Sequence, residues 1–156
     1  MNVDFSIYTD EIRKVINEWE QKLLLLPEKG ITEKRNHQNR TIKQLLGHLI
    51  DSASNNHQRI IRLQYNDHLI FPDYTQDNDR WIAIQDYQHA DWENLVQLWK
   101  YFNLHIIHLI ETVDQSKLNN YWTDFEGRKV TLEEMIKGYS SHLNLHMSDI
   151  NDLILK

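Results

Sequence analysis

Residues 139–150 form the stretch YSSHLNLHMSDI, and the apolar residues in and around it recur at the spacing of an α-helix. At about 100° per residue, His142 and His146 differ by only about 40° around such a helix. Met135 and Leu143 lie on the same side of it. The stretch therefore predicts an amphipathic helix that carries two imidazoles, one turn apart, on or beside its buried face.

Three other segments show the same periodicity, and short sequence signals mark where the helices begin and end. With the helix around residues 139–150, the pattern predicts four long helices, over about 9–26, 41–65, 91–113 and 131–153. Thr41 with Gln44 and Thr131 with Glu134 have the form of capping boxes. Asp91 is a good cap for the third helix, and Ser6 or Thr9 is expected to cap the first.

The connections between these helices differ in length. The polar connection over residues 28–40 contains His37, which we expect in solvent. Residues 66–90 form the longest connection, with a short helix expected near residues 78–84. Such a length allows the second and third helices to run parallel, while a small hairpin is expected around Gly127. We therefore predict an all-α fold, a four-helix bundle with a long crossover between helices 2 and 3, in a single domain over residues 1–156.

Composition narrows the function classes. The net charge of −6 argues against binding to nucleic-acid backbones and leaves no polybasic patch for a membrane surface. The absence of Cys excludes disulfides, thiolate zinc ligands and a cysteine nucleophile. The first residues lack the order of a signal peptide, and no apolar run approaches the roughly 18 residues of a membrane span. We therefore expect a cytoplasmic protein that binds neither nucleic acid nor membranes.

A third imidazole is needed to make the pair in the last helix into a metal site. His48 borders the apolar side of the second helix and is the best candidate to meet His142 and His146 across the bundle. Three His ligands leave coordination positions open for water or substrate, and imidazoles suit zinc, nickel, copper or iron. His57 should face water, whereas His105 and His108 form a rival pair on the third helix.

Polar residues near the three histidines are candidates for catalysis and binding. Asp51 and Asp149 each lie three residues from a candidate ligand, so either can be a hydrogen-bond partner of a ligand, a fourth ligand or a general base. The candidate substrate-binding residues are Asn55, Arg59, Trp81 and Tyr139, and Arg59 is suited to hold an anionic group. The plainer alternatives are solvated carboxylates, aromatic core residues and an Arg59 paired on the surface.

The sequence resembles the DinB/YfiT-like superfamily over nearly its whole length. Residues 47–59 resemble its second helix, residues 139–146 resemble the His-x-x-x-His of its fourth helix, and residues 71–74 with 79–81 are similar to its linker. The resemblance implies a four-helix bundle with one divalent metal, often assigned as nickel or zinc, on His48, His142 and His146. It also implies a homodimer.

The superfamily does not imply one activity. It includes metal-dependent hydrolases and S-transferases or isomerases that use an external low-molecular-weight thiol such as bacillithiol, mycothiol or glutathione. We therefore expect a metal-dependent enzyme that activates water or a thiol for a small-molecule substrate. The alternatives are a non-catalytic stress or interaction protein that a metal stabilises, and a plain helical dimer in which the three histidines are core residues.

Overall fold

The four long helices follow closely the segments whose apolar periodicity predicts them. The computed structural model describes residues 1–70 and 77–156, and its long helices are α1 (Ser6–Leu24), α3 (Ile42–Arg62), α5 (Trp92–Glu111) and α6 (Leu132–Leu155). The shorter helical elements are α2 (Glu28–Thr32), α4 (Asn78–Ile84) and the 3₁₀ turns η1 (Tyr87–His89) and η2 (Gln115–Lys117). The prediction of an all-α four-helix bundle is confirmed.

Local side-chain chemistry fixes the starts of three of these helices. Thr41 accepts a hydrogen bond from the Gln44 amide while the Gln44 side chain accepts one from the Thr41 amide, and Thr131 and Glu134 form the same capping box. The Asp91 side chain caps α5. The expected cap of α1 is wrong, because Phe5 occupies that position, and the Asp4 carboxylate accepts the hydrogen bond from the Ser6 amide. Thr9 already lies inside the helix, so its hydroxyl donates backwards to a carbonyl oxygen.

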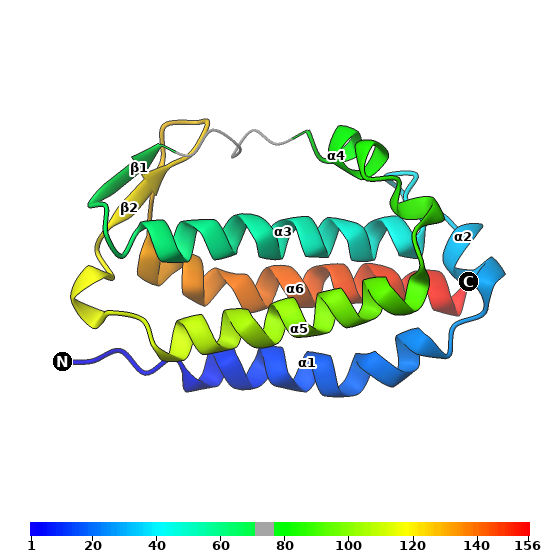
Figure 1. The fold of residues 1–156 in the computed structure, drawn as a ribbon, viewed down its shortest axis with the longest axis horizontal. Coiled ribbons are helices and arrows are strands. Elements are labelled where there is room, and N and C mark those ends of the chain that lie inside the picture. Colours follow the sequence, from blue (N-terminus) through cyan, green and yellow to red (C-terminus); the bar gives the residue numbers. More distant parts are fainter. Residues whose placement is uncertain (71–76) are drawn as a thin grey trace.

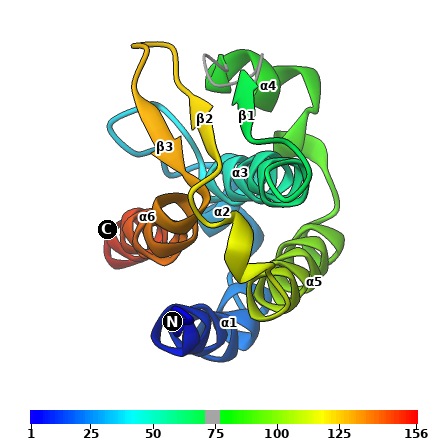
Figure 2. The same cartoon turned by 90° about the vertical axis from the view of Figure 1, so that its left-hand side faces the viewer.

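The helices pack as a square in which α3 and α1 each contact both α5 and α6. α1 and α6 run in one direction, and α3 and α5 run in the other (Figure 1). The end-on view shows the same four helices around a common core (Figure 2). Since consecutive helices joined by a short loop would be antiparallel, the parallel pair α3 and α5 requires the long crossover that the sequence predicts.

One glycine fixes that crossover onto the bundle. A Cβ atom on Gly47 of α3 would lie 2.2 Å from the Cδ2 atom of Tyr87 in η1. Because non-bonded heavy atoms do not approach so closely, Gly47 gives the Tyr87 ring room to lie on the helix backbone. The Tyr87 side chain is buried, at 5% exposed. The close contact at Gly47 is therefore with the crossover and not with a long helix.

A small sheet at one end of the bundle was not predicted. Its strands are β1 (His68–Ile70), β2 (Tyr121–Thr123) and β3 (Lys129–Thr131). β1 pairs in parallel with β2, and β2 pairs antiparallel with β3. Strands of three residues are too short to show an alternating pattern. The hairpin expected around Gly127 is the β2–β3 turn, in which Gly127 has φ +78°.

The described parts of the two longer connections each contain a short helix, of which the sequence predicts only the second. Residues 28–40 include α2, whose Ile31 is 1% exposed, while His37 is exposed as expected. In the crossover, α4 has the bounds that the sequence predicts. The sequence also predicts that Phe71 and Tyr74 of the crossover pack onto the bundle, and these two residues lie outside the described ones. Among the described helices, none combines the length and hydropathy of a membrane span.

Candidate metal centre

Three imidazoles from two helices meet where α3 packs against α6. His48, His142 and His146 each offer a ring nitrogen, and these three nitrogens lie within 4.8 Å of one another. The ring centroid of His146 is 4.7 Å from that of His48 and 4.6 Å from that of His142. The structure therefore brings together the three residues that the sequence singles out as metal ligands.

The apolar faces of both helices hold this arrangement in place. His48 is flanked on α3 by Leu45 and Leu49, which are 0% and 2% exposed. Leu143 and Met147 on α6 are each 2% exposed. Since these side chains lock the two helices together, the imidazoles beside them have little freedom to move apart.

Burial keeps the three imidazoles in the neutral form that a metal ion requires. It lowers the pKa of His48 to about 3, with a further contribution from the proximity of His146, Arg40 and His142. Burial and His146 lower the pKa of His142 to about 4. The pKa of His146 is also lowered, mainly by burial. At neutral pH the ring nitrogens therefore present free lone pairs.

The spacing of the nitrogens fits one divalent ion. The Nε2 atoms of His142 and His146 are 3.2 Å apart. Two imidazole nitrogens bound at 2.0–2.1 Å in a tetrahedral site lie roughly 3.3 Å apart. Within the described residues, the buried Nδ1 atom of His48 has no hydrogen-bond partner. A buried polar atom without a hydrogen-bond partner raises the free energy of the fold. An ion that binds all three rings therefore suits this site better than three imidazoles without an ion.

Polar partners orient the two rings of α6. The Nδ1 atom of His142 is 3.4 Å from the Ser52 hydroxyl, and the Nδ1 atom of His146 lies within ion-pair range of Asp149, 3.4 Å from a carboxylate oxygen, without the geometry of a hydrogen bond. Such partners on the far nitrogen fix the tautomer of a ligating imidazole and raise its basicity. Asp149 is therefore placed to orient a ligand, and its role as a catalytic base stays a prediction.

A cavity of about 260 Å³ opens beside His142. In it the guanidinium of Arg59 lies 4.1 Å from the centre of the Trp122 ring. The cavity is bounded by α3, α6 and strand β2, through the residues Ser52, Asn56, Arg59, Trp122, Met135, Gly138, Tyr139 and His142. The cavity therefore brings a guanidinium and an aromatic ring next to one imidazole of the cluster.

The candidate substrate-binding residues do not all lie in this cavity. Tyr139 lines it with its ring only, because its hydroxyl donates a 2.7 Å hydrogen bond to Asn103 in the core. Asn55 is buried on α3. Trp81 of α4 instead lines a separate cavity together with Asp51. Trp122 was not among the predicted residues, because it reaches Arg59 only through the β2–β3 hairpin.

Asp51 faces away from the three histidines. One of its carboxylate oxygens accepts hydrogen bonds from Gln85 at 2.8 Å and from the Tyr87 hydroxyl at 2.7 Å. Burial raises the pKa of Asp51, and these two hydrogen bonds oppose that effect. The role of Asp51 as a general base stays a prediction, because the contacts of this carboxylate are with the crossover.

The histidines outside the centre form looser contacts. His57 was expected to face water, and this is wrong, since it is half-buried with its ring centre 5.6 Å from that of Phe102 and 5.4 Å from that of His105. The reason is that α5 packs against this side of α3, and a helical-wheel projection of α3 alone does not show which neighbouring helix covers it. His105 and His108 have ring centres 6.2 Å apart. Across the described residues, only the three histidines of the centre form a group of three that could hold a metal ion.

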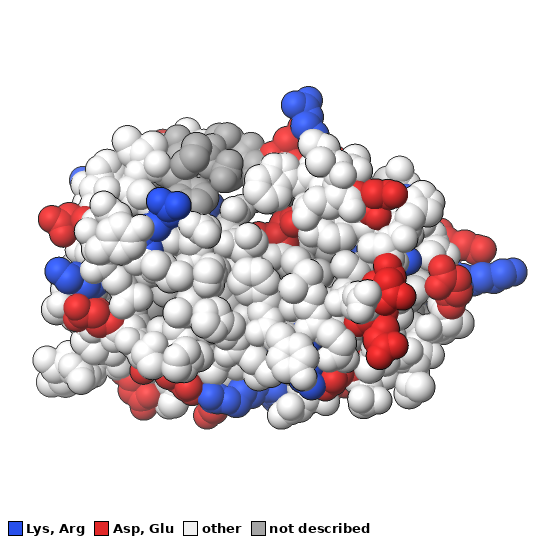
Figure 3. Space-filling model, in the orientation of Figure 1, with Lys and Arg blue, Asp and Glu red and all other residues white. Residues whose placement is uncertain are grey.

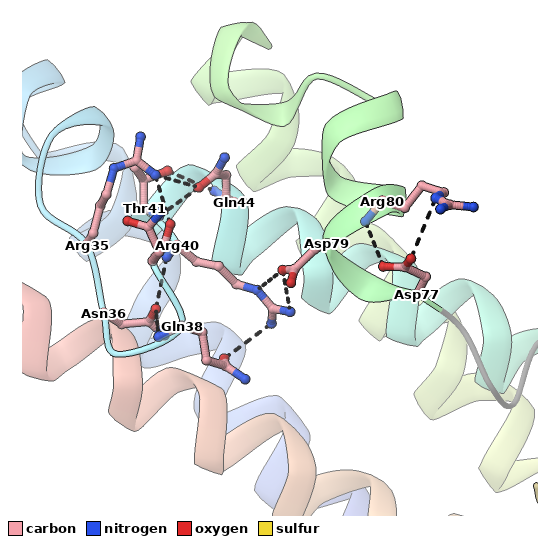
Figure 4. A network of polar contacts seen from close by, with 10 residues as sticks. Arg35, Asn36, Gln38, Arg40, Thr41, Gln44, Asp77, Asp79 and Arg80 are labelled. Atoms are coloured by element: carbon pink, nitrogen blue, oxygen red, sulfur yellow. Dashed lines mark hydrogen bonds and ion pairs between the residues drawn. The ribbon is translucent and has the colours of Figure 1, made fainter.

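An ion pair between the buried Arg40 and the exposed Asp79 joins the start of α3 to the crossover beside this centre. Arg40 is 6% exposed and donates to the Oδ1 atom of Asp79 through Nε at 3.2 Å and through a terminal nitrogen at 3.0 Å. Figure 4 shows the two side chains between the residue 36–41 loop and α4. The Arg40 charge contributes to the lowered pKa of both His48 and His146, so it lies close enough to affect the centre.

Comparison with known proteins agrees with this arrangement. The sequence model of the DinB superfamily matches residues 11–150. The chain belongs to the DinB superfamily. A search of curated proteins found no match.

Two solved structures show the same fold as this DinB superfamily chain. The first is YfiT from Bacillus subtilis, described as a probable metal-dependent hydrolase with an unusual four-helix bundle topology. It is 18% identical, with a TM-score of 0.83, over 96% of this chain and 85% of YfiT. The second is a mycothiol-dependent maleylpyruvate isomerase, 13% identical with a TM-score of 0.75 over 95% of this chain. The match spans 61% of the isomerase.

Proposed function

We propose that this DinB superfamily chain is a metal-dependent enzyme that acts on a small-molecule substrate. The observation that carries the proposal is the cluster of His48, His142 and His146, whose ligand nitrogens lie within 4.8 Å of one another beside a 260 Å³ cavity. Three protein ligands with an open position are typical of catalytic metal sites, whereas structural sites are closed by four.

The chain's own residues have separate tasks in this proposal. The ion is held by His48, His142 and His146. The contacts with Asp149 and Ser52 fix the orientation of the two imidazole rings of α6. When bound, a divalent ion lowers the pKa of a coordinated water or thiol and polarises a substrate oxygen. Arg59, which lies on the Trp122 ring, binds an anionic group of the substrate in the cavity.

The nucleophile is water or an external thiol. The described cavity is bounded by one guanidinium, one amide, one imidazole and several hydroxyl and apolar groups, which suits an acyl or carboxylate-bearing substrate in either reaction. The chain has no Cys of its own, so a thiol reaction requires a second small molecule. The resemblance of the sequence to thiol-using members supports this route, as does the likeness of the fold to the isomerase. We also propose that the enzyme acts as a homodimer in the cytoplasm.

Metal analysis of the untagged protein tests the proposal. We expect about one divalent ion per chain in the wild type and none in His146→Ala, because two remaining imidazoles bind an ion far more weakly. His108→Ala, which removes an exposed imidazole of α5, is the matched control and should keep the ion. If the wild type contains no metal after incubation with nickel and zinc, the proposal is wrong.

An activity screen then separates the two reactions. Turnover of esters or amides by the metal-loaded protein, with no requirement for a thiol, would establish hydrolysis. Turnover of an electrophile only with a low-molecular-weight thiol would establish thiol transfer. Arg59→Ala should raise KM for anionic substrates in either case.

A non-catalytic role is the second candidate, because the three ligands come from two helices. An ion on His48 of α3 and on His142 and His146 of α6 would cross-link the bundle. In that case metal removal would lower Tm strongly, while no compound would compete for the cavity beside His142.

A further inference from the structure

A second cavity of about 330 Å³ lies on the opposite side of α3 from the cavity beside His142. Ile50 of this cavity and Ser52 of the metal-side cavity differ by about 160° around the helix. The two cavities share no described lining residue. The second one, called here the Asp51 cavity, lies between α3, α4 and α5 and is bounded by Ile50, Asp51, Ser54, Trp81, Ile84, Gln85 and Phe102.

The walls of the Asp51 cavity are mostly apolar. Trp81 and Ile84 come from α4 and Phe102 comes from α5, so the crossover forms one wall of the cavity. Ile84 is 75% exposed, so it lies at the rim of the cavity. The volume is near the lower end of the range for small-molecule pockets, which suits a compound with a single ring.

Asp51 is the only charged residue among the described lining residues. Its side chain is buried, at 3% exposed. The Oδ1 atom accepts hydrogen bonds from Gln85 and Tyr87, whereas the buried Oδ2 atom has no hydrogen-bond partner within the described residues. A buried carboxylate with one vacant oxygen is stabilised by a cationic donor, because the donor replaces both the lost hydration and the missing counter-charge.

The surrounding surface favours the same kind of ligand. In the orientation of Figure 1, the area between α4 and α5 is largely white and red with little blue (Figure 3). The net charge of the chain is −6. An ammonium compound would therefore be attracted towards this face, whereas a carboxylate compound would be repelled.

We propose that the Asp51 cavity binds a small primary ammonium compound that carries one aromatic or aliphatic ring. The ammonium group donates to Oδ2 of Asp51, and the ring lies between Trp81, Ile84 and Phe102. The site is independent of the metal centre, so it does not rest on the enzymatic proposal. In this proposal Asp51 and Trp81 bind the ammonium compound, whereas His142 and Arg59 face the substrate of the enzyme.

Binding of 2-phenylethylamine to the full-length protein tests this site, with 2-phenylethanol and phenylacetate as matched compounds of similar size. Titrations of isotope-labelled protein by NMR give the affinity and the location together. We expect the amine to bind about tenfold more tightly than the alcohol, since a charged donor to a buried carboxylate outweighs a neutral one. The shifted amides should include those of Asp51, Ser54 and Trp81.

Three variants define the contact. Asp51→Asn keeps an oxygen acceptor for Gln85 and Tyr87 but places an amide where the ammonium would bind, so the affinity for the amine should fall about tenfold. Asp86→Asn is the matched control, since Asp86 does not line the cavity and has a positive φ of 48°, which Asn accepts well. Ser54→Leu fills the cavity and should abolish binding while the metal content is unchanged.

Several results would overturn the proposal. They are equal binding of the amine and phenylacetate, unchanged affinity in Asp51→Asn, shifted amides around His142, or no binding of any compound at about 10 mM. A dimer that hides this face, and that Ile84→Asp converts to monomers, would also overturn it. His146→Ala should bind the amine as the wild type does, so loss of the metal centre leaves this test intact.

Discussion

The two sides of α3 treat buried ionisable groups in opposite ways. His48 meets two other imidazoles on α6, and burial lowers its pKa to about 3. Asp51, three residues further on, meets Gln85 and Tyr87 of the crossover, and burial raises its pKa. The same loss of hydration moves both groups towards their neutral forms. A neutral imidazole is ready to bind a cation, whereas a buried carboxylate needs donors, so one helix supports two different kinds of site.

Substitution of Gly47 should have the largest effect, since this residue joins the two sides. In Gly47→Ala, the new Cβ would overlap the Tyr87 ring, whose position holds Asp51, and would strain the turn that carries His48. We expect the free energy of unfolding to fall by roughly 3 kcal/mol, near the upper end for overpacking. Urea denaturation measures this change. Gly138→Ala, where an added Cβ meets no atom within 4 Å, is the control.

Acid should destabilise the metal-free protein through the histidine side. The pKa of His48 is about 3 in the fold and about 6.5 in the unfolded chain. The unfolded state therefore binds the proton first, and stability falls as the pH drops from about 6.5 towards about 3. At pH 5 the loss from His48 is about 2 kcal/mol.

The comparison of two chelated proteins isolates this contribution. His48→Gln should show a flatter decline of Tm between pH 7 and pH 5 than the wild type, because it lacks the proton-binding group in the unfolded chain. Parallel declines in the two proteins would contradict the assignment of the lowered pKa to His48.

Asp149 should affect metal affinity more than stability. Its carboxylate is 3.4 Å from the Nδ1 atom of His146. Loss of such a partner weakens metal binding by about tenfold to a hundredfold. Competition with a chelator should therefore show a dissociation constant raised by about tenfold in Asp149→Asn. Asp152→Asn, one turn further along α6, should leave the constant unchanged, and an effect as large as that of Asp149→Asn would argue for a general charge effect.

The smallest effect is expected at the Asp51 side. Tyr87→Phe removes the 2.7 Å hydrogen bond to Asp51 but keeps the ring over Gly47. We expect a loss of about 1 kcal/mol in the free energy of unfolding, with no change in metal content. Thermal unfolding and metal analysis of the same preparation check both parts. A change in metal content would mean that the two sides of α3 are coupled through the helix.

The helices and the ligand set were predictable because they rest on local signals. The capping boxes at Thr41 and Thr131 act within one turn, and the pair His142 and His146 follows from the helical repeat alone. The cap of α1 failed as a prediction because Ser6 and Thr9 were judged by residue type, without knowing the turn at which the helix begins. The three short strands left no periodic pattern to detect.

The sequence by itself determined an all-α bundle with a long crossover, and it selected His48, His142 and His146, because helical periodicity and capping chemistry are encoded locally. Only the tertiary structure decided what each neighbouring side chain faces. Trp122 reaches Arg59 through the hairpin, His57 is covered by α5, and Asp51 turns to Tyr87. The physical reason is that burial and pKa depend on which distant segment packs against a helix, and a single helix repeat contains no information about its partner.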